Sequence, residues 1–205
     1  MGIFENFLYV TDIDRVVKIS IPDEKIAKEY AVNGAQFLND ITVDPEGNIY
    51  ITDMSTNQIH RIHENKIEQF YKNDLIISPN GLAFENGKLL IGTKNGIFSL
   101  GMKDQQLKHL VKDTGGIDGL EPDGQGNYII SDWSGKVQVV CPDKKPILLF
   151  KTTEEGINAA DIVYIIEKQL LLVAFCASDL LPVKELSATH TPLHHVDDRC
   201  FHVPC

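Results

Sequence analysis

The chain has 205 residues, of which 43% are hydrophobic and 23% charged, a composition typical of a globular domain. Its 19 basic and 29 acidic side chains give a formal charge of −10, which argues against a nucleic-acid partner, because affinity for phosphates needs clustered Lys and Arg. The longest apolar run, residues 170–177, is far shorter than the roughly 20 residues that span a bilayer as a helix. The first residues lack the features of a signal peptide. We therefore expect one cytoplasmic domain that binds neither nucleic acid nor a membrane. The alternative is a secreted full-length parent, if the amino terminus of this chain is truncated.

A repeat of about forty residues runs along the chain. Taken in chain order, its copies occupy residues 6–12 in part, 39–53, 80–93, 118–132 and 161–174. The copies at 39–53 and 118–132 align without a gap, so that four residues of the first, Asp44, Gly47, Asn48 and Asp53, return in the second as Asp123, Gly126, Asn127 and Asp132. Such a period is typical of architectures in which each supersecondary unit packs against the next.

Each copy has the two-residue alternation of short β-strands. In the first full unit three apolar pairs follow one another: Ile41 and Val43, Ile49 and Ile51, Ile59 and Ile62. Clusters of Asp, Pro, Gly, Asn and Ser separate them as turns, and no segment sustains a helical stripe. An all-β chain with about four strands in each unit is typical of a β-propeller. A β-sandwich is the alternative, but sandwich strands do not recur in register at a fixed period.

The repeat predicts one incomplete propeller domain over residues 1–177, with sequence for four to five blades. We expect a partial blade, three full blades and another partial blade, at residues 1–35, 36–74, 75–113, 114–152 and 153–177. Residues 178–205 leave the pattern and hold four of the seven His and two of the four Cys. We expect this segment to be a disordered tail foreign to the ancestral protein. A metal-binding tail is the alternative, although its spacing fits no standard zinc pattern.

Four polar residues stand at equivalent places, directly before the apolar residues of the first strand of a copy: Asn39, Asn80, Asp118 and Asp161. In a propeller that strand lines the axis, so we expect these side chains to face a common space. Carboxylate and amide oxygens favour Ca²⁺ or Mg²⁺ and accept Mn²⁺ or Zn²⁺. The sequence therefore predicts a divalent-cation site. The alternative is that these residues bond to their own backbone in turns.

A second polar series, Thr11-Asp12, Thr52-Asp53 and Ser131-Asp132, ends the second strand of three copies. Turn residues follow the series, so we expect each Asp to hold a turn through bonds to the backbone. The His residues of the repeat region lie on polar stretches without partners at ligand spacing. We therefore expect surface positions for all three of them, His60, His63 and His109.

Three motifs that each open a forty-residue unit carry a resemblance: Asn39-Asp40, residues 78–82 (SPNGL) and residues 117–120 (IDGL). They resemble the regucalcin and gluconolactonase family, a relative of paraoxonases and diisopropyl fluorophosphatase, and residues 116–137 are close to bacterial members. The resemblance covers about residues 6–175. It implies a six-bladed β-propeller with one divalent cation on the axis, Ca²⁺ first and Zn²⁺, Mg²⁺ or Mn²⁺ as alternatives. It also implies action on a small lactone or ester.

The resemblance implies residue roles as well. Asn80 and Asp118 match two metal ligands of the family, and Asn39, with Asp40 beside it, matches the family's substrate-contacting position. Asp118 is also the candidate base: the cation polarises the lactone carbonyl while Asp118 deprotonates a water, with direct attack by Asp118 as the alternative. Asp161 is placed near the substrate by the repeat alone.

One ligand of the family has no counterpart. The family's Glu in a Glu-Gly-Pro motif of the first blade is not matched upstream of Asn39, and Glu5 lacks the motif. Three functions therefore compete: a metal-dependent hydrolase of the lactonase type, a degenerate propeller that serves as a binding module, and a chain that closes by pairing with another chain. Self-association is expected if the propeller is open, because exposed strand edges and apolar faces attract partners.

Overall fold

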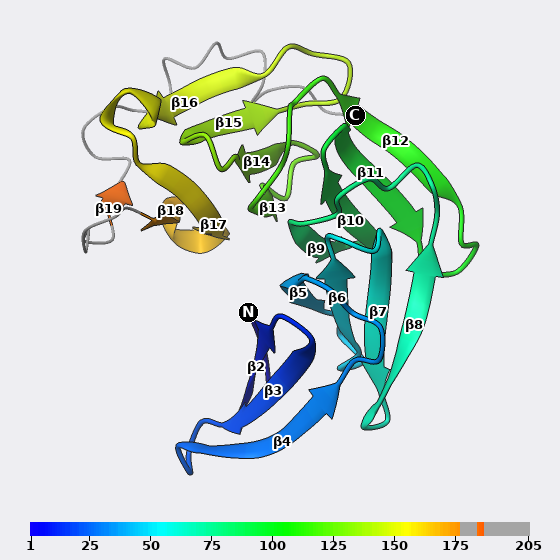
Figure 1. Ribbon diagram of the computed structural model, residues 1–205. Coiled ribbons are helices and arrows are strands. Elements are labelled where there is room, and N and C mark those ends of the chain that lie inside the picture. Colours follow the sequence, from blue (N-terminus) through cyan, green and yellow to red (C-terminus); the bar gives the residue numbers. More distant parts are fainter. Residues whose placement is uncertain (177–183, 187–205) are drawn as a thin grey trace. The chain divides into compact units, whose positions relative to one another are not determined.

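The computed structural model describes residues 1–176 and 184–186 (Figure 1). Within these residues the chain is all-β, with five antiparallel sheets and two 3-10 turns, Thr153–Glu155 and Ile166–Lys168. No helix in this part of the chain has the length and apolar character needed to cross a bilayer. The chain divides into two compact units, Met1–His109 and Leu110–Cys205. Most of the tail expected at residues 178–205 lies outside the described residues.

The first unit contains three sheets of four consecutive strands (Figure 1). The first sheet consists of β1 (Gly2–Phe4), β2 (Phe7–Asp12), β3 (Arg15–Ser20) and β4 (Lys25–Ala31). The second consists of β5 (Leu38–Val43), β6 (Ile49–Asp53), β7 (Gln58–His63) and β8 (Lys66–Lys72). The third consists of β9 (Leu82–Glu85), β10 (Lys88–Thr93), β11 (Gly96–Gly101) and β12 (Leu107–Lys112), which crosses the division between the units. Strands that follow one another in sequence are neighbours in each sheet, as in a propeller blade.

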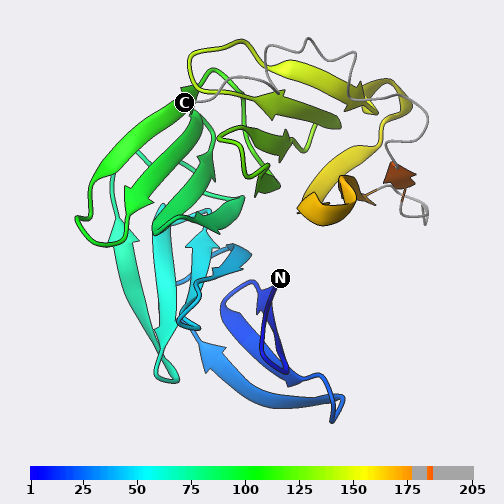
Figure 2. The same ribbon diagram turned by 180° about the vertical axis from the view of Figure 1, so that it is seen from behind.

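The second unit contains two sheets built in the same way, and Figure 2 shows the same succession of strands from behind. The fourth sheet consists of β13 (Leu120–Pro122), β14 (Tyr128–Ser131), β15 (Lys136–Val140) and β16 (Ile147–Lys151). The fifth consists of β17 (Asn158–Ile165), β18 (Leu170–Cys176) and β19 (Lys184–Leu186).

Residues 1–35, expected as a partial blade, contain all four strands of the first sheet. The strand that the repeat did not show is β1, which pairs with β2 through Gly2 opposite Tyr9 and Phe4 opposite Phe7. It has only three residues, too few to display a two-residue period.

The turn between the first two strands explains why the repeat is conspicuous in the sequence. In the second sheet Asp44 Oδ1 accepts the Asn48 N–H at 2.8 Å, and Asp44 Oδ2 accepts the Asn48 side-chain amide at 2.7 Å. Gly47 has φ +84, and a Cβ there would meet the Phe4 ring at 2.5 Å. The fourth sheet repeats both carboxylate bonds, from Asn127 to Asp123, at 3.0 and 2.7 Å. The recurring Asp, Gly and Asn are thus the residues that close one turn.

Successive sheets within each unit pack face to face. Side chains of a strand alternate between the two faces, so Ile49 and Ile51 of β6 pack with the first sheet, while Tyr50 packs with the third. We call the face that meets the preceding sheet the leading face, and the opposite one the trailing face. In the second unit, Ile129 on the trailing face of the fourth sheet shares a core with Val173 on the leading face of the fifth. Full burial of one such side chain contributes about 1.5–3 kcal/mol.

Candidate functional site

The candidate site residues lie at a β-bulge that recurs from sheet to sheet. In the second sheet Leu38 is opposite Asp53 and Ile41 is opposite Ile51, so both Asn39 and Asp40 face Thr52. A bulge of this kind leaves one extra residue on one strand and re-aims the side chains beside it.

The same bulge occurs in the next two sheets, just before β9 and β13. Asn80 N donates to Gly92 O at 2.9 Å, and Gly92 N donates to Gly81 O at 2.7 Å. The corresponding bonds of the fourth sheet join Asp118 N to Ser131 O at 2.9 Å and Ser131 N to Gly119 O at 3.1 Å. Asn39, Asn80 and Asp118 therefore hold the first bulge position in three consecutive sheets, as the repeat predicts.

Asp161 does not share that position. In the fifth sheet Ala159 is opposite Phe175 and Ile162 is opposite Val173, which makes Ala160 the first bulge residue and Asp161 the second. Asp161 is therefore the counterpart of Asp40, and the expected equivalence of Asp161 with Asn39 is wrong by one residue. The error arose because an extra bulge residue cannot be located from strand periodicity alone.

A hydroxyl from the preceding sheet holds the first bulge position in three places. Thr11 Oγ1 donates to Asn39 O at 2.5 Å, and Thr52 Oγ1 donates to Asn80 O at 3.0 Å. The Ser131 hydroxyl makes the corresponding bond to Ala160 O. Each links the second strand of one sheet to the first strand of the next, so the main chain at the candidate site is fixed by the packing of neighbouring blades.

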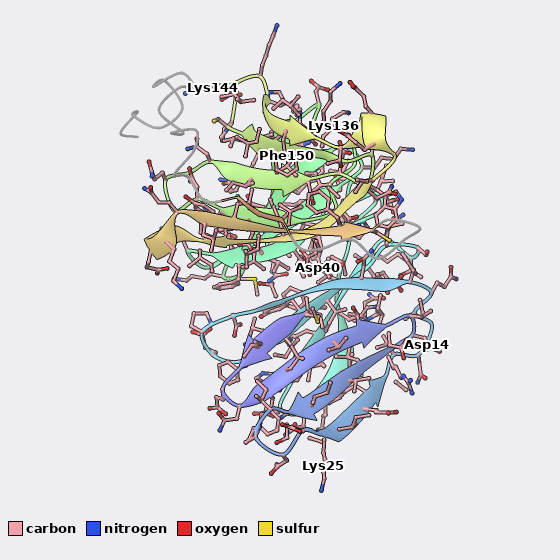
Figure 3. The ribbon with its side chains drawn as sticks, turned by 90° about the vertical axis from the view of Figure 1, so that its left-hand side faces the viewer. Asp14, Lys25, Asp40, Lys136, Lys144 and Phe150 are labelled. Carbon is pink, nitrogen blue, oxygen red and sulfur yellow. The ribbon has the colours of Figure 1, made fainter. Side chains whose placement is uncertain are left out.

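Asp40, labelled in Figure 3, is tied to the backbone through both carboxylate oxygens. Oδ1 accepts the Ile41 N–H at 2.7 Å, and Oδ2 accepts the Leu82 N–H of the third sheet at 2.7 Å. The amino group of Met1 lies 3.7 Å from Oδ1. Asp161 resembles it in part, because its Oδ1 accepts the Ile162 N–H at 2.8 Å. These bonds give the second bulge position a part in holding strands together.

The second polar series behaves as predicted at two of its three members. Asp53 is fully buried and accepts the N–H groups of Gln36 and Phe37, both at 3.1 Å. Burial would raise the pKa of Asp53, but the bonds from Thr56, Phe37 and Gln36 outweigh it and lower that pKa. Asp132 likewise accepts backbone N–H groups within its turn, whereas Asp12 instead receives the side chain of Arg15, at 2.9 Å from Nε.

His60 departs from expectation. It is 4% exposed rather than at the surface, and its Nε2 lies 3.8 Å from Asp53 Oδ2. Burial lowers the pKa of His60, and the attraction of Asp53 offsets this only in part. A polar strand that looks exposed in the sequence can be buried when a second sheet packs over it, and Asp53 was the signal that could have indicated a partner.

The two units share the candidate residues. Asn39, Asp40 and Asn80 belong to the first unit, and Asp118 and Asp161 belong to the second. The three first-position side chains are half-buried, and the Oδ1 atom of Asn80 is itself buried. In the described part of the chain, no three or more His, Cys, Asp or Glu side chains are grouped so as to hold a metal ion. Glu5 is exposed in the β1–β2 turn, with φ +52.

No protein-family model and no curated protein matches the chain, but many solved structures resemble it. One is the nidogen/laminin complex, with a TM-score of 0.68, 16% identity, and coverage of 82% of this chain and 67% of that chain. Virginiamycin B lyase from Staphylococcus aureus gives 0.64 and 15%, with coverage of 93% and 70%. XC5397 from Xanthomonas campestris, a gluconolactonase, gives 0.59 and 17%, with coverage of 78% and 61%.

These likenesses establish the fold class. Several unrelated proteins share the arrangement at 14–17% identity, so the likeness lies in the architecture, and the chain is an all-β β-propeller protein. The chain spans about two thirds of the nidogen/laminin and lyase chains and 61% of the gluconolactonase. One gluconolactonase stands among the neighbours, in line with the resemblance seen in the sequence motifs.

Proposed function

We propose that this chain is a divalent-metal-dependent hydrolase of the lactonase or esterase type. Asn80 and Asp118 are the proposed metal ligands, Asn39 the substrate-contacting amide, and Asp118 also the general base. The observation that carries the proposal is the recurring bulge, which gives these three side chains the same place on three consecutive blades. Bulges are over-represented next to active sites. The likeness in fold to a gluconolactonase supports the choice of chemistry.

The donor atoms suit a hard cation in kind, because they are carboxylate and amide oxygens without sulfur or imidazole. Ca²⁺ is our first choice, with Zn²⁺, Mg²⁺ and Mn²⁺ as alternatives. When bound, the cation would supply Lewis-acid polarisation of the ester carbonyl. Since the described residues hold no acidic cluster, water and substrate would complete its coordination.

The side chains of the chain itself have distinct tasks in this proposal. Asp118 accepts the proton of the attacking water, and Asn39 donates its amide N–H to the bound lactone. The Thr11 hydroxyl holds the backbone carbonyl of Asn39, and the Thr52 hydroxyl holds that of Asn80. These bonds limit the motion of the backbone that carries the two side-chain amides. Such support favours a fixed orientation of substrate relative to the water.

The test is a thermal melt with each of the four cations, followed by a pH-stat assay of gluconolactone hydrolysis corrected for the spontaneous rate. A cation that binds the folded state should raise the melting temperature of the wild type. Asp118→Asn should lose both the shift and the turnover. Asp143→Asn, at an exposed carboxylate between β15 and β16, is the matched control and should keep both. The proposal is wrong if no cation shifts the melt, or if the shift survives in Asp118→Asn.

A non-catalytic binding propeller is the second candidate. The lack of an assembled acidic cluster among the described residues favours it, because cation affinity rises with the number of charged ligands. If the chain is a binding propeller, we expect no hydrolysis of the lactone under any condition. A cation-dependent melt without hydrolysis would select this function.

A further inference from the structure

The first sheet presents an apolar face that is open to solvent. Across its four strands, Ile3 is opposite Leu8, Leu8 opposite Ile19, and Ile19 opposite Ile26, so the four form one row on one face. Ile3 is 64% exposed and Ile26 is 60% exposed, while the two inner members are half-buried. A contiguous apolar surface of this kind on a folded protein marks a site of association.

This open face is the leading face of a blade. Thr11 and Thr52 hold equivalent places, each donating to the first bulge residue of the next sheet, so Leu8 corresponds to Ile49, three residues before that hydroxyl. In the second sheet Ile49 is 1% exposed, because the trailing face of the first sheet covers it. The first sheet therefore repeats an apolar row whose inner members, Ile49 and Ile62, are buried in the second sheet.

The fifth sheet has the complementary open face. Its leading face, with Leu171 and Val173, packs against the fourth sheet. The residues that alternate with these face the other way: Val163 is 49% exposed, and Leu172, paired with it, is half-buried. Among the described residues, the trailing face of this sheet is thus apolar and partly exposed.

We propose that the leading face of the first sheet binds the trailing face of the fifth sheet of a second copy of this chain. Within each unit, a leading face packs on the trailing face of the sheet before it, and the new contact continues that arrangement from one copy to the next. The contact is head to tail, because it joins two different surfaces. Such contacts close into a ring or run on as an open chain of copies.

The edge of the leading face has the polar rim expected of an interface. Arg15 bonds to Asp12 at 2.9 Å and to Glu29 at 3.2 Å, and all three side chains are exposed, at the end of β2, at the start of β3 and near the end of β4. An apolar centre with a polar rim is the usual anatomy of a protein–protein contact. This association does not depend on the proposed hydrolase activity.

Three substitutions test the contact. Ile26→Glu places a charge on the leading face, and Val163→Glu places one on the trailing face. Leu75→Glu is the matched control, because Leu75 is 60% exposed and lies between β8 and β9, off both faces. Sedimentation velocity over a concentration series should show association of the wild type and of Leu75→Glu, and monomers for each of the other two variants. Melting curves followed by circular dichroism establish that each variant is folded, and Ile3→Glu replaces Ile26→Glu if the latter is not.

Mixing distinguishes head-to-tail from like-to-like pairing. Ile26→Glu retains an intact trailing face and Val163→Glu an intact leading face, so the two monomeric variants should form a one-to-one complex when mixed. The proposal is overturned if the wild type is monomeric at every concentration, if either face variant associates as the wild type does, or if the mixture contains monomers only.

Discussion

The second and fourth sheets are copies of one template, yet each holds the following sheet in its own way. In the second sheet Asp40 reaches across to the Leu82 N–H of the third sheet at 2.7 Å. The fourth sheet has Gly119 at this place, and a Cβ there would lie 2.7 Å from Ile162 N of the fifth sheet. That N–H is bonded instead to Asp161 of its own sheet, at 2.8 Å.

At both junctions a backbone N–H needs an acceptor, and the acceptor comes from a different sheet in each case. The first amide after the bulge is bonded to a carboxylate in both junctions, since a buried N–H without a partner is costly. At Leu82 the carboxylate comes from the preceding sheet, and Gly81 stands beside it. At Ile162 it comes from Asp161, and glycine stands in the preceding sheet. The second bulge position therefore has a structural part at both junctions, whereas the proposed ligands lie at the first position.

The largest effect should come from Asp40→Ala. This change leaves the Ile41 and Leu82 N–H groups without their carboxylate, and both residues are 4% exposed. We expect a loss of about 3 kcal/mol in the free energy of unfolding, from two charge-assisted bonds. Asp161→Ala removes one bond at an exposed residue and should cost about 1 kcal/mol. Urea unfolding measures both, and equal losses would contradict the difference between the junctions.

The fold could be predicted from the sequence because the residues that close its turns recur at fixed positions. Asp44 and Asn48 close one turn with the same bonds that Asp123 and Asn127 make in another, so the repeat records a geometry and not only a composition. The alternation of Ile49, Tyr50 and Ile51 between two cores follows from the strand period.

The bulge and the buried pair could not be predicted, for two physical reasons. An inserted residue shifts register without changing the apolar pattern, so Asp161 was aligned with Asn39 when its counterpart is Asp40. The burial of His60 depends on packing between sheets, which a single strand does not encode. The equivalence of Asn39, Asn80 and Asp118 in position is thus confirmed and that of Asp161 is wrong by one residue, while the roles of these residues in a site stay predictions.

Gly119→Ala should have the next largest effect, and it tests the close approach of the fourth and fifth sheets. The new methyl group would meet the Ile162 backbone nitrogen at 2.7 Å, so the backbone of one sheet has to move. Overpacking of this kind costs about 2 kcal/mol in the free energy of unfolding. Gly116→Ala is the control, because a Cβ there has no atom within 4 Å. Urea unfolding of the two variants should differ clearly, and similar curves would show that the junction has room to adjust.

The smallest effect on stability should come from His60, which is buried in the second sheet. The fourth sheet has Gln138 at the equivalent place, because His60 pairs with Ile51 and Gln138 pairs with the equivalent Ile130. Because the pKa of His60 is lowered on folding, the unfolded chain binds a proton more readily below about pH 6.5. The free energy of unfolding should therefore fall as the pH decreases from about 6.5 toward the lowered pKa. His60→Gln should weaken that dependence.

His63→Gln is the control for this measurement, because the His63 side chain is 50% exposed. Urea unfolding at a series of pH values should give a shallower slope for His60→Gln than for either the wild type or His63→Gln. An unchanged slope in His60→Gln would mean that Asp53, 3.8 Å away, compensates the charge that His60 gains on protonation. The His60–Asp53 pair would then not make the free energy of unfolding depend on pH, and the second and fourth sheets would not differ in this respect.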